Sequence, residues 1–66
     1  MRILLNGEPR ELPAPESVAA LLTRLSLDAR LVAVELDRVV VKRARYGDTD
    51  VRDGAEVEIV AFVGGG

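Results

Sequence analysis

Hydrophobic and polar residues alternate along this chain with two different periods, and the change of period separates strands from a helix. Four short apolar runs bounded by turn residues have the composition of β-strands, and they cover residues 2–5, 32–36, 39–41 and 56–62. Between the first two runs, apolar residues recur at spacings of three and four: Val18, Leu21, Leu22 and Leu25. This spacing predicts one helix that begins after the N-cap Ser17 and ends near Leu25 or Ser26.

Turn residues indicate how the first strand is paired. Asn6-Gly7 is a strong signal for a two-residue hairpin, so residues 8–12 are expected to return as a second strand. Pro9 cannot donate a hydrogen bond to a neighbouring strand, which places this second strand at a sheet edge or leaves it partly paired. Residues 45–50 are expected to form a polar loop that contains Tyr46.

The order of these elements is a hairpin, a helix and then two or three further strands. One helix with one apolar stripe needs one sheet face to cover it. The predicted fold class is therefore α+β, with a mixed sheet of four to five strands curled around one helix and the first and last strands adjacent at its centre. This is the β-grasp, or ubiquitin-like, arrangement. It is expected to occupy residues 1–63 as one domain, followed by residues 64–66 as a flexible C-terminal glycine tail.

Strand parity predicts an exposed apolar surface near the C-terminal end. Side chains alternate between the two faces of a strand, so the face of the last strand that carries Glu56 and Glu58 is its solvent face. Four apolar residues are predicted to share this outer face and to form a partner-binding patch: Leu4, Ala33, Val60 and Phe62. The alternative is a β-bulge that shifts the parity, or a loop that covers these residues.

Composition narrows the function classes. The chain has 66 residues, with no cysteine, no histidine and a single lysine, Lys42, so the usual nucleophiles, general bases and metal ligands are missing. A protein that is not an enzyme and holds no metal is therefore expected. The longest apolar run is far too short to span a membrane, which makes a cytoplasmic location, without a membrane partner, the default expectation.

The charge pattern does not favour nucleic-acid binding. The net charge is −2, and Tyr46 and Phe62 are too few aromatic residues for a base-stacking surface. The basic segment 42–45 could touch a phosphate, but it is more typical of an exposed loop or of a charged sheet edge that resists aggregation.

The chain ends in three glycines, Gly64, Gly65 and Gly66. Without a Cβ atom these residues can thread a channel too narrow for any other residue, and fully extended they reach only about 10 Å. Such a tail can bring a C-terminal carboxylate into a partner's active site while the domain stays outside. A frayed terminus is the alternative that the glycines alone leave open.

Together with the rest of the sequence, these glycines resemble the tail of a known family. The chain resembles the ThiS family, the small ubiquitin-like sulfur carriers of thiamin biosynthesis, over essentially its full length. The segments that carry the resemblance are Ile3-Leu4-Leu5-Asn6-Gly7-Glu8-Pro9, Val18-Ala19-Ala20-Leu21-Leu22, Val32-Ala33-Val34-Glu35-Leu36, Arg43, and Asp53-Gly54 through Gly65-Gly66. The terminal glycines are specific only in combination with these segments.

The resemblance implies a carrier rather than a catalyst. An E1-like adenylyltransferase of the ThiF type would use ATP to adenylate the carboxylate of Gly66, and sulfur from a persulfide donor protein would replace AMP to give a thiocarboxylate. This sulfur would pass to a thiazole synthase of the ThiG type. Gly64 and Gly65 would be threading residues. The chain itself would bind no cofactor, because the ATP belongs to the activating partner.

The chain departs from the family's pattern around one loop. Asp37-Arg38 replaces a common Asn-Gly, and because arginine is poorly suited to a positive φ angle, this turn is not expected to be a tight type I′ turn. Lys42 and Tyr46 stand where proline and tryptophan are frequent. These changes affect the expected shape of the loop and its partner contacts, and they leave the tail untouched.

Other functions stay open at this point. The molybdopterin-synthase small subunit has a similar fold and tail, although the short length and the Asn6-Gly7-Glu8-Pro9 opening speak against it, and a carrier for cysteine or thiolated-tRNA synthesis would use the same tail chemistry. A protein modifier that forms isopeptide bonds through Gly66 is a second class, which attachment to lysines of other proteins would reveal. A plain interaction or RNA-binding module with an idle tail is a third, supported only by Lys42, Arg43 and Arg45.

Overall fold

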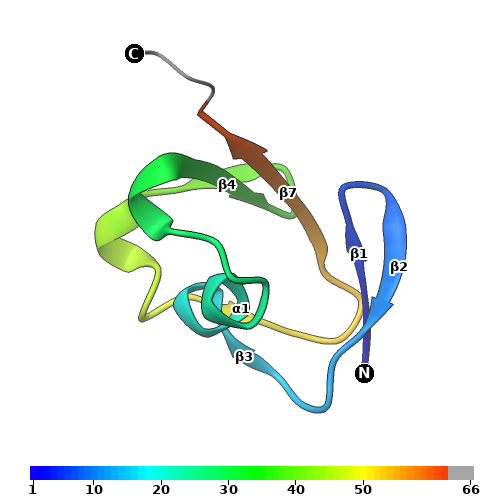
Figure 1. The fold of residues 1–66 in the computed structure, drawn as a ribbon. Helices are drawn as coiled ribbons and strands as arrows, with labels where there is room; N and C mark the ends of the chain where they lie inside the picture. The colour runs from blue at the N-terminus through cyan, green and yellow to red at the C-terminus, as the bar shows by residue number, and fades with distance from the viewer. Residues whose placement is uncertain (63–66) are drawn as a thin grey trace.

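The computed structural model describes residues 1–62, in which a five-stranded sheet curls around a short helix (Figure 1). Short 3₁₀ turns at Ala29–Leu31 and Arg43–Arg45 lie before and after the segment 32–41. The strands and the helix are, in chain order, β1 (Arg2–Leu5), β2 (Glu8–Glu11), β3 (Glu16–Ser17), α1 (Val18–Arg24), β4 (Val32–Leu36), β5 (Val39–Val41), β6 (Asp50–Val51) and β7 (Glu56–Ala61).

The first and last strands lie side by side at the centre of the main sheet, whose order is β2-β1-β7-β4-β5. β1 and β7 run parallel, with Leu5 beside Val57, and the other neighbouring pairs in this sheet are antiparallel. β2, which contains Pro9, lies at an edge, as its missing backbone donor predicts. This mixed sheet around a helix confirms the predicted β-grasp fold.

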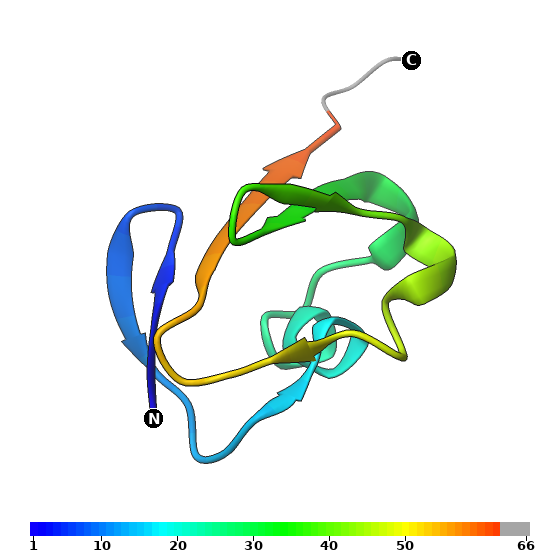
Figure 2. The same ribbon diagram turned by 180° about the vertical axis from the view of Figure 1, so that it is seen from behind.

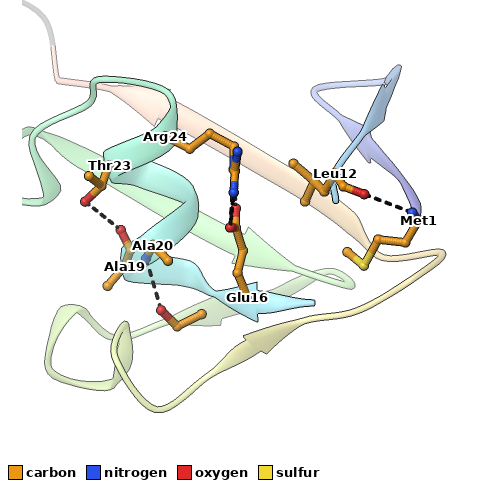
Figure 3. A network of polar contacts seen from close by, with 8 residues as sticks. Met1, Leu12, Glu16, Ala19, Ala20, Thr23 and Arg24 are labelled. Atoms are coloured by element: carbon orange, nitrogen blue, oxygen red, sulfur yellow. Dashed lines mark hydrogen bonds and ion pairs between the residues drawn. The ribbon is translucent and has the colours of Figure 1, made fainter. Parts of the chain in front are cut away.

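The helix begins where the sequence predicts because Ser17 caps it. The Ser17 hydroxyl accepts a hydrogen bond from the backbone N–H of Ala20 at 3.0 Å. Beside it, the Arg24 guanidinium donates to the Glu16 carboxylate from Nε at 2.9 Å and from Nη2 at 2.8 Å (Figure 3). These hydrogen bonds from Arg24 lower the pKa of Glu16. The pair ties the last turn of the helix to the segment just before its first turn.

The core lies between the helix and the inner face of the sheet. Leu21 and Val18 of the helix are completely buried, which confirms the predicted apolar stripe. Tyr46 lies in the polar loop as predicted, yet only 4% of it is exposed, and its carbonyl accepts a hydrogen bond from the N–H of Ala19 at 2.9 Å. The buried apolar residues are Ile3, Leu12, Val18, Leu21, Leu22, Val32, Val34, Tyr46, Val51, Ala55 and Val57.

The prediction for the turn between β4 and β5 was wrong. Asp37 and Arg38 have φ angles of 51° and 70°, so both central residues adopt the positive φ that a type I′ turn requires. Contacts from β7 stabilise this conformation: Asp37 Oδ1 accepts from the N–H of Glu56 at 2.9 Å, and the N–H of Asp37 donates to the Glu56 carbonyl at 2.8 Å. Tertiary hydrogen bonds therefore outweigh the local preference of arginine.

A second, two-stranded sheet of β3 and β6 was not part of the sequence prediction. Glu16 pairs with Val51, and Ser17 pairs with Asp50. Two residues per strand are too few to show an alternating pattern, so the sequence carries no signal for them. Seen from behind, β6 passes beside the helix before the chain turns into β7 (Figure 2). Across residues 1–62, no helix has the length and apolar character needed to cross a membrane.

Candidate functional site

Strand β7 leads directly to the predicted site at the C-terminus. The strand ends at Ala61, opposite Val32 of β4, and the N–H of the next residue, Phe62, donates to the Leu31 carbonyl at 2.8 Å. In both ribbon views the end of β7 lies at the opposite end of the molecule from the N-terminus (Figures 1 and 2). The predicted site residues that lie outside the described part of the chain are Gly64, Gly65 and Gly66.

Three of the predicted patch residues lie together on the outer face of the sheet. Val60 and Phe62 follow each other at alternate positions near the end of β7 and are 62% and 61% exposed. Ala33 of β4 is paired directly opposite Val60 and is also exposed. Their predicted exposure is confirmed, and their role in partner binding stays a prediction. Ala33, Val60 and Phe62 are called the outer patch below.

Leu4 does not join the outer patch. It is 40% exposed, as parity predicts, but it is paired with Glu56 at the start of β7. Val60 lies four residues further along that strand, which is about 13 Å at the rise of an extended chain. The exposed side chain of Glu58 lies between the two positions. Leu4 therefore shares the face of the sheet with the outer patch but is separated from it by acidic residues.

Sequence reasoning missed Val40, which borders the outer patch. Val40 of β5 is paired opposite Glu35 of β4 and is 68% exposed. It lines a shallow hollow of about 80 Å³ that also includes Ala33 and Val60 of the patch. No local pattern reveals Val40, because its place depends on the register of β5 against β4, which the two-residue turn at Asp37 and Arg38 fixes.

Strand parity also predicts that Val57, Ile59 and Ala61 of β7 face inward, and the structure confirms this only in part. Val57 is buried and Ile59 is half-buried, as parity predicts, but Ala61 is exposed. Ala61, Leu27 and Ile59 border an open groove on the inner side, so Ala61 faces the side that parity predicts but is not covered there. The short helix ends at Arg24 and leaves this end of the strand uncovered.

Two carboxylates lie beside the outer patch. Glu35 and Glu58 are paired directly opposite each other on neighbouring strands, where like charges repel. Neither forms an ion pair with another residue in the 1–62 range; the ion pairs found there are Arg2–Glu11, Arg24–Glu16, Arg30–Asp28 and Arg52–Asp50. The outer face is thus apolar at the end of β7 and acidic next to it. Such a face complements a surface with apolar and basic groups.

The ion pair between Asp28 and Arg30 stabilises the connection from α1 to β4, which contacts Phe62. Asp28 accepts hydrogen bonds from Nη2 of Arg30 at 2.8 Å and from its backbone N–H at 2.9 Å. These hydrogen bonds from Arg30 lower the pKa of Asp28 to about 2, so the carboxylate is ionised at neutral pH. Asp28 caps the 3₁₀ turn that ends at Leu31, whose carbonyl accepts from Phe62.

Comparison with known proteins settles the family. The model of the ThiS family matches residues 3–66. The chain belongs to the ThiS family. A crystal structure of a thiamine biosynthesis protein (ThiS) from Geobacter metallireducens supports this assignment: it is 36% identical, the match covers 100% of both chains, and the TM-score is 0.88.

Two further ThiS-like matches occur within longer proteins named thiazole synthase. The protein of Paramagnetospirillum magneticum is 46% identical and that of Magnetococcus marinus 39% identical, in both cases over 66 residues. The match covers 100% of this chain but only 20% of each thiazole synthase. An uncharacterized protein of Pyropia yezoensis, ycf40, is 34% identical over 64 residues and matches across 90% of its own length.

Among residues 1–62, no group of three or more histidine, cysteine, aspartate or glutamate side chains is placed to hold a metal ion. Every polar side-chain atom that is buried in this range has a hydrogen-bond partner. What the geometry offers is an exposed apolar and acidic face beside the strand that leads to the terminal glycines.

Proposed function

We propose that this chain is a sulfur carrier of thiamin biosynthesis and that Gly66 carries the sulfur as a C-terminal thiocarboxylate. The observation that supports this most is the full-length similarity to a solved thiamine biosynthesis protein, ThiS, with a TM-score of 0.88. The second is the sequence Gly64-Gly65-Gly66 directly after the last strand region. The chain would act as a co-substrate of other enzymes and catalyse nothing itself.

The proposed chemistry follows from the reactivity of a carboxylate. An α-carboxyl group has a pKa of roughly 3.5, so it is ionised at neutral pH and is a poor electrophile. A ThiF-type adenylyltransferase would couple it to the AMP part of ATP and release pyrophosphate, which turns it into an acyl group with a good leaving group. The terminal sulfur of a persulfide on a donor protein would then displace AMP, which gives an acyl disulfide. A thiol would reduce the S–S bond of this acyl disulfide, releasing the thiocarboxylate and leaving a disulfide on the donor. ATP is a substrate of the activating partner here, and no cofactor of the carrier is required.

The outer patch would bind the partner enzymes while the glycine tail enters their active sites. Gly64 and Gly65 would thread into the active site of the partner, because they have no side chain to obstruct a narrow channel. Ala33, Val60 and Phe62 would contact the body of the partner, since contiguous exposed apolar surface beside a functional terminus is typical of a binding site. Leu4 would contribute only to a contact that also spans Glu56 and Glu58.

A thiazole synthase of the ThiG type is the proposed sulfur acceptor. In the two bacterial thiazole synthases, a segment similar to this whole chain lies in one polypeptide with several times more sequence. Covalent linkage raises the effective concentration of two modules for each other, so natural fusions favour modules that act together. This observation supports thiazole formation over molybdopterin, cysteine or thiolated-tRNA synthesis as the destination of the sulfur.

A single-turnover transfer assay tests the acceptor. The thiocarboxylated chain is mixed in turn with purified thiazole synthase plus its small-molecule substrates and with a molybdopterin-synthase large subunit plus its own. We expect the thiocarboxylate to be consumed, with thiazole product formed, in the first mixture only. Consumption in the molybdopterin mixture, or attachment of the chain to protein lysines, would assign the carrier to another pathway or to protein modification.

A further inference from the structure

The hairpin turn after β1 supplies an unusual bridge to the last strand. Within the parallel pair, the N–H of Leu4 donates to the Ala55 carbonyl at 2.9 Å, and the N–H of Asn6 donates to the Val57 carbonyl at 2.8 Å. The next bond in this series would join Ile59 to a residue of β1 beyond Asn6. The backbone cannot provide it, because the chain turns away into β2 at Asn6 and Gly7, with φ angles of 50° and 81°.

The side chain of Asn6 makes this missing connection. Its Oδ1 accepts a hydrogen bond from the N–H of Ile59 at 2.8 Å, and its Nδ2 donates to the carbonyl of Ile59 at 3.2 Å. A carboxamide offers the same donor and acceptor as a peptide group. The Asn6 side chain therefore stands in for one peptide unit of β1 and extends the β1–β7 pairing by one step.

We propose that Asn6 is a positioning residue, whose carboxamide holds β7 at Ile59 so that the strand keeps its direction up to Phe62. β1 pairs with β7 only at Glu56 and Val57 through its backbone, so beyond this point the β1 side of β7 depends on Asn6. Phe62 follows Ile59 by three residues and belongs to the outer patch. The functional consequence rests on the proposed function: the bridge sets how the outer patch meets a partner.

Residue 6 must adopt a positive φ angle and also hydrogen-bond Ile59 through its side chain, and asparagine meets both requirements. Its backbone tolerates the positive φ of the turn better than most residues do, and its amide reaches Ile59. Asn6→Gly keeps the turn, since glycine adopts positive φ freely, but removes both bridging hydrogen bonds. Asn6→Asp keeps the acceptor but replaces the donor with a charged oxygen that repels the Ile59 carbonyl. Both variants therefore keep the turn and break the bridge, so their effects report on the bridge alone.

Amide hydrogen exchange of the free protein, followed by NMR, tests the bridge without any partner. The probe is the N–H of Phe62, which donates to Leu31, and the reference is the N–H of Leu4, which donates to Ala55 at the other end of the strand pair. Relative to the reference, we expect Phe62 to exchange at least tenfold faster in Asn6→Gly and also faster in Asn6→Asp. An unchanged ratio in both variants would overturn the proposal.

The matched control is Asp37→Gly. Asp37 also lies in a hairpin turn with positive φ, 51°, and its side chain also accepts a hydrogen bond from β7, but at Glu56 near the start of the strand. The loss of this contact is expected to leave the ratio of Phe62 to Leu4 exchange within twofold of the parent chain. If Asp37→Gly accelerates Phe62 as much as Asn6→Gly does, the effect is general loosening and the positioning role is wrong.

A second arm measures activation by the adenylating enzyme at a temperature where all variants are folded. We expect kcat/KM to fall about tenfold for Asn6→Gly, mainly through kcat, and to stay within twofold for Asp37→Gly. If the parent chain is not activated, the proposed function fails. The exchange result still shows whether the Asn6 side chain holds β7 at Ile59. If the parent is activated and Asn6→Gly equals it, the positioning role in the reaction is wrong.

Discussion

Replacing Phe62 by glutamate is expected to lower the rate of C-terminal activation by about 30-fold or more while the domain stays folded. Phe62 is 61% exposed and lies at the base of the glycine tail, so the change removes no core contact. Truncating an aromatic anchor at an interface typically costs about 2 kcal/mol or more, and about 1.4 kcal/mol corresponds to a factor of ten. The new carboxylate would also add to the negative charge of Glu58 and Glu35 on the same face.

The measurement is kcat/KM for adenylation, alongside thermal unfolding of the same samples. Val39→Glu is the matched control, because Val39 is equally exposed, at 66%, but pairs with Leu36 and so points to the inner side of the sheet. We expect this control to keep the parent rate within about twofold. A folded Phe62→Glu variant with the parent rate would contradict the partner-binding role of the outer patch, and an unfolded variant would show that Phe62 is a core residue.

Replacing Leu21 by alanine is expected to remove most of the stability of this domain. Leu21 lies on the apolar face of the helix and is completely buried. Leucine-to-alanine changes at such positions cost roughly 3–5 kcal/mol, because the transfer free energy and the cavity both count. A 66-residue domain has a free energy of unfolding of about 3–10 kcal/mol in total, so little stability is left to the variant.

Urea unfolding followed by circular dichroism measures this loss. Leu27→Ala serves as the control, because Leu27 follows the same helix but is 36% exposed. The control is expected to lose about 1 kcal/mol or less, and the midpoint for Leu21→Ala to fall far below that of the parent. Equal midpoints for the two variants would mean that the helix face does not form the core described above.

Much of this fold could be predicted because its strands have one buried and one solvent face. Alternation in β4 and β7 identified the inward and outward residues, and the three- and four-residue spacing together with Ser17 fixed the helix. The turn at Asp37 and Arg38 could not be predicted, because its positive φ angles depend on hydrogen bonds to Glu56, 19 residues away. Local preference alone pointed to the wrong turn.

The candidate site was predictable in composition but not in arrangement. Parity correctly placed Val60 and Phe62 on the outer face, yet it could not show that Leu4 lies at the other end of β7. That separation depends on the register of the β1–β7 pair, which the hydrophobic pattern does not specify for a four-residue strand. Val40 was missed for the related reason that its register depends on the turn before it.

Intact-mass spectrometry of the chain, after incubation with an adenylating enzyme of the ThiF type, ATP, a persulfide sulfur source and a thiol reductant, tests the central claim most directly. A chain that lacks Gly66 is the control. The proposed function predicts a mass change equal to one sulfur atom replacing one oxygen atom, localised to Gly66 and absent from the control. With an enzyme shown to be active on another carrier, an unchanged mass would contradict the proposal that this chain carries sulfur.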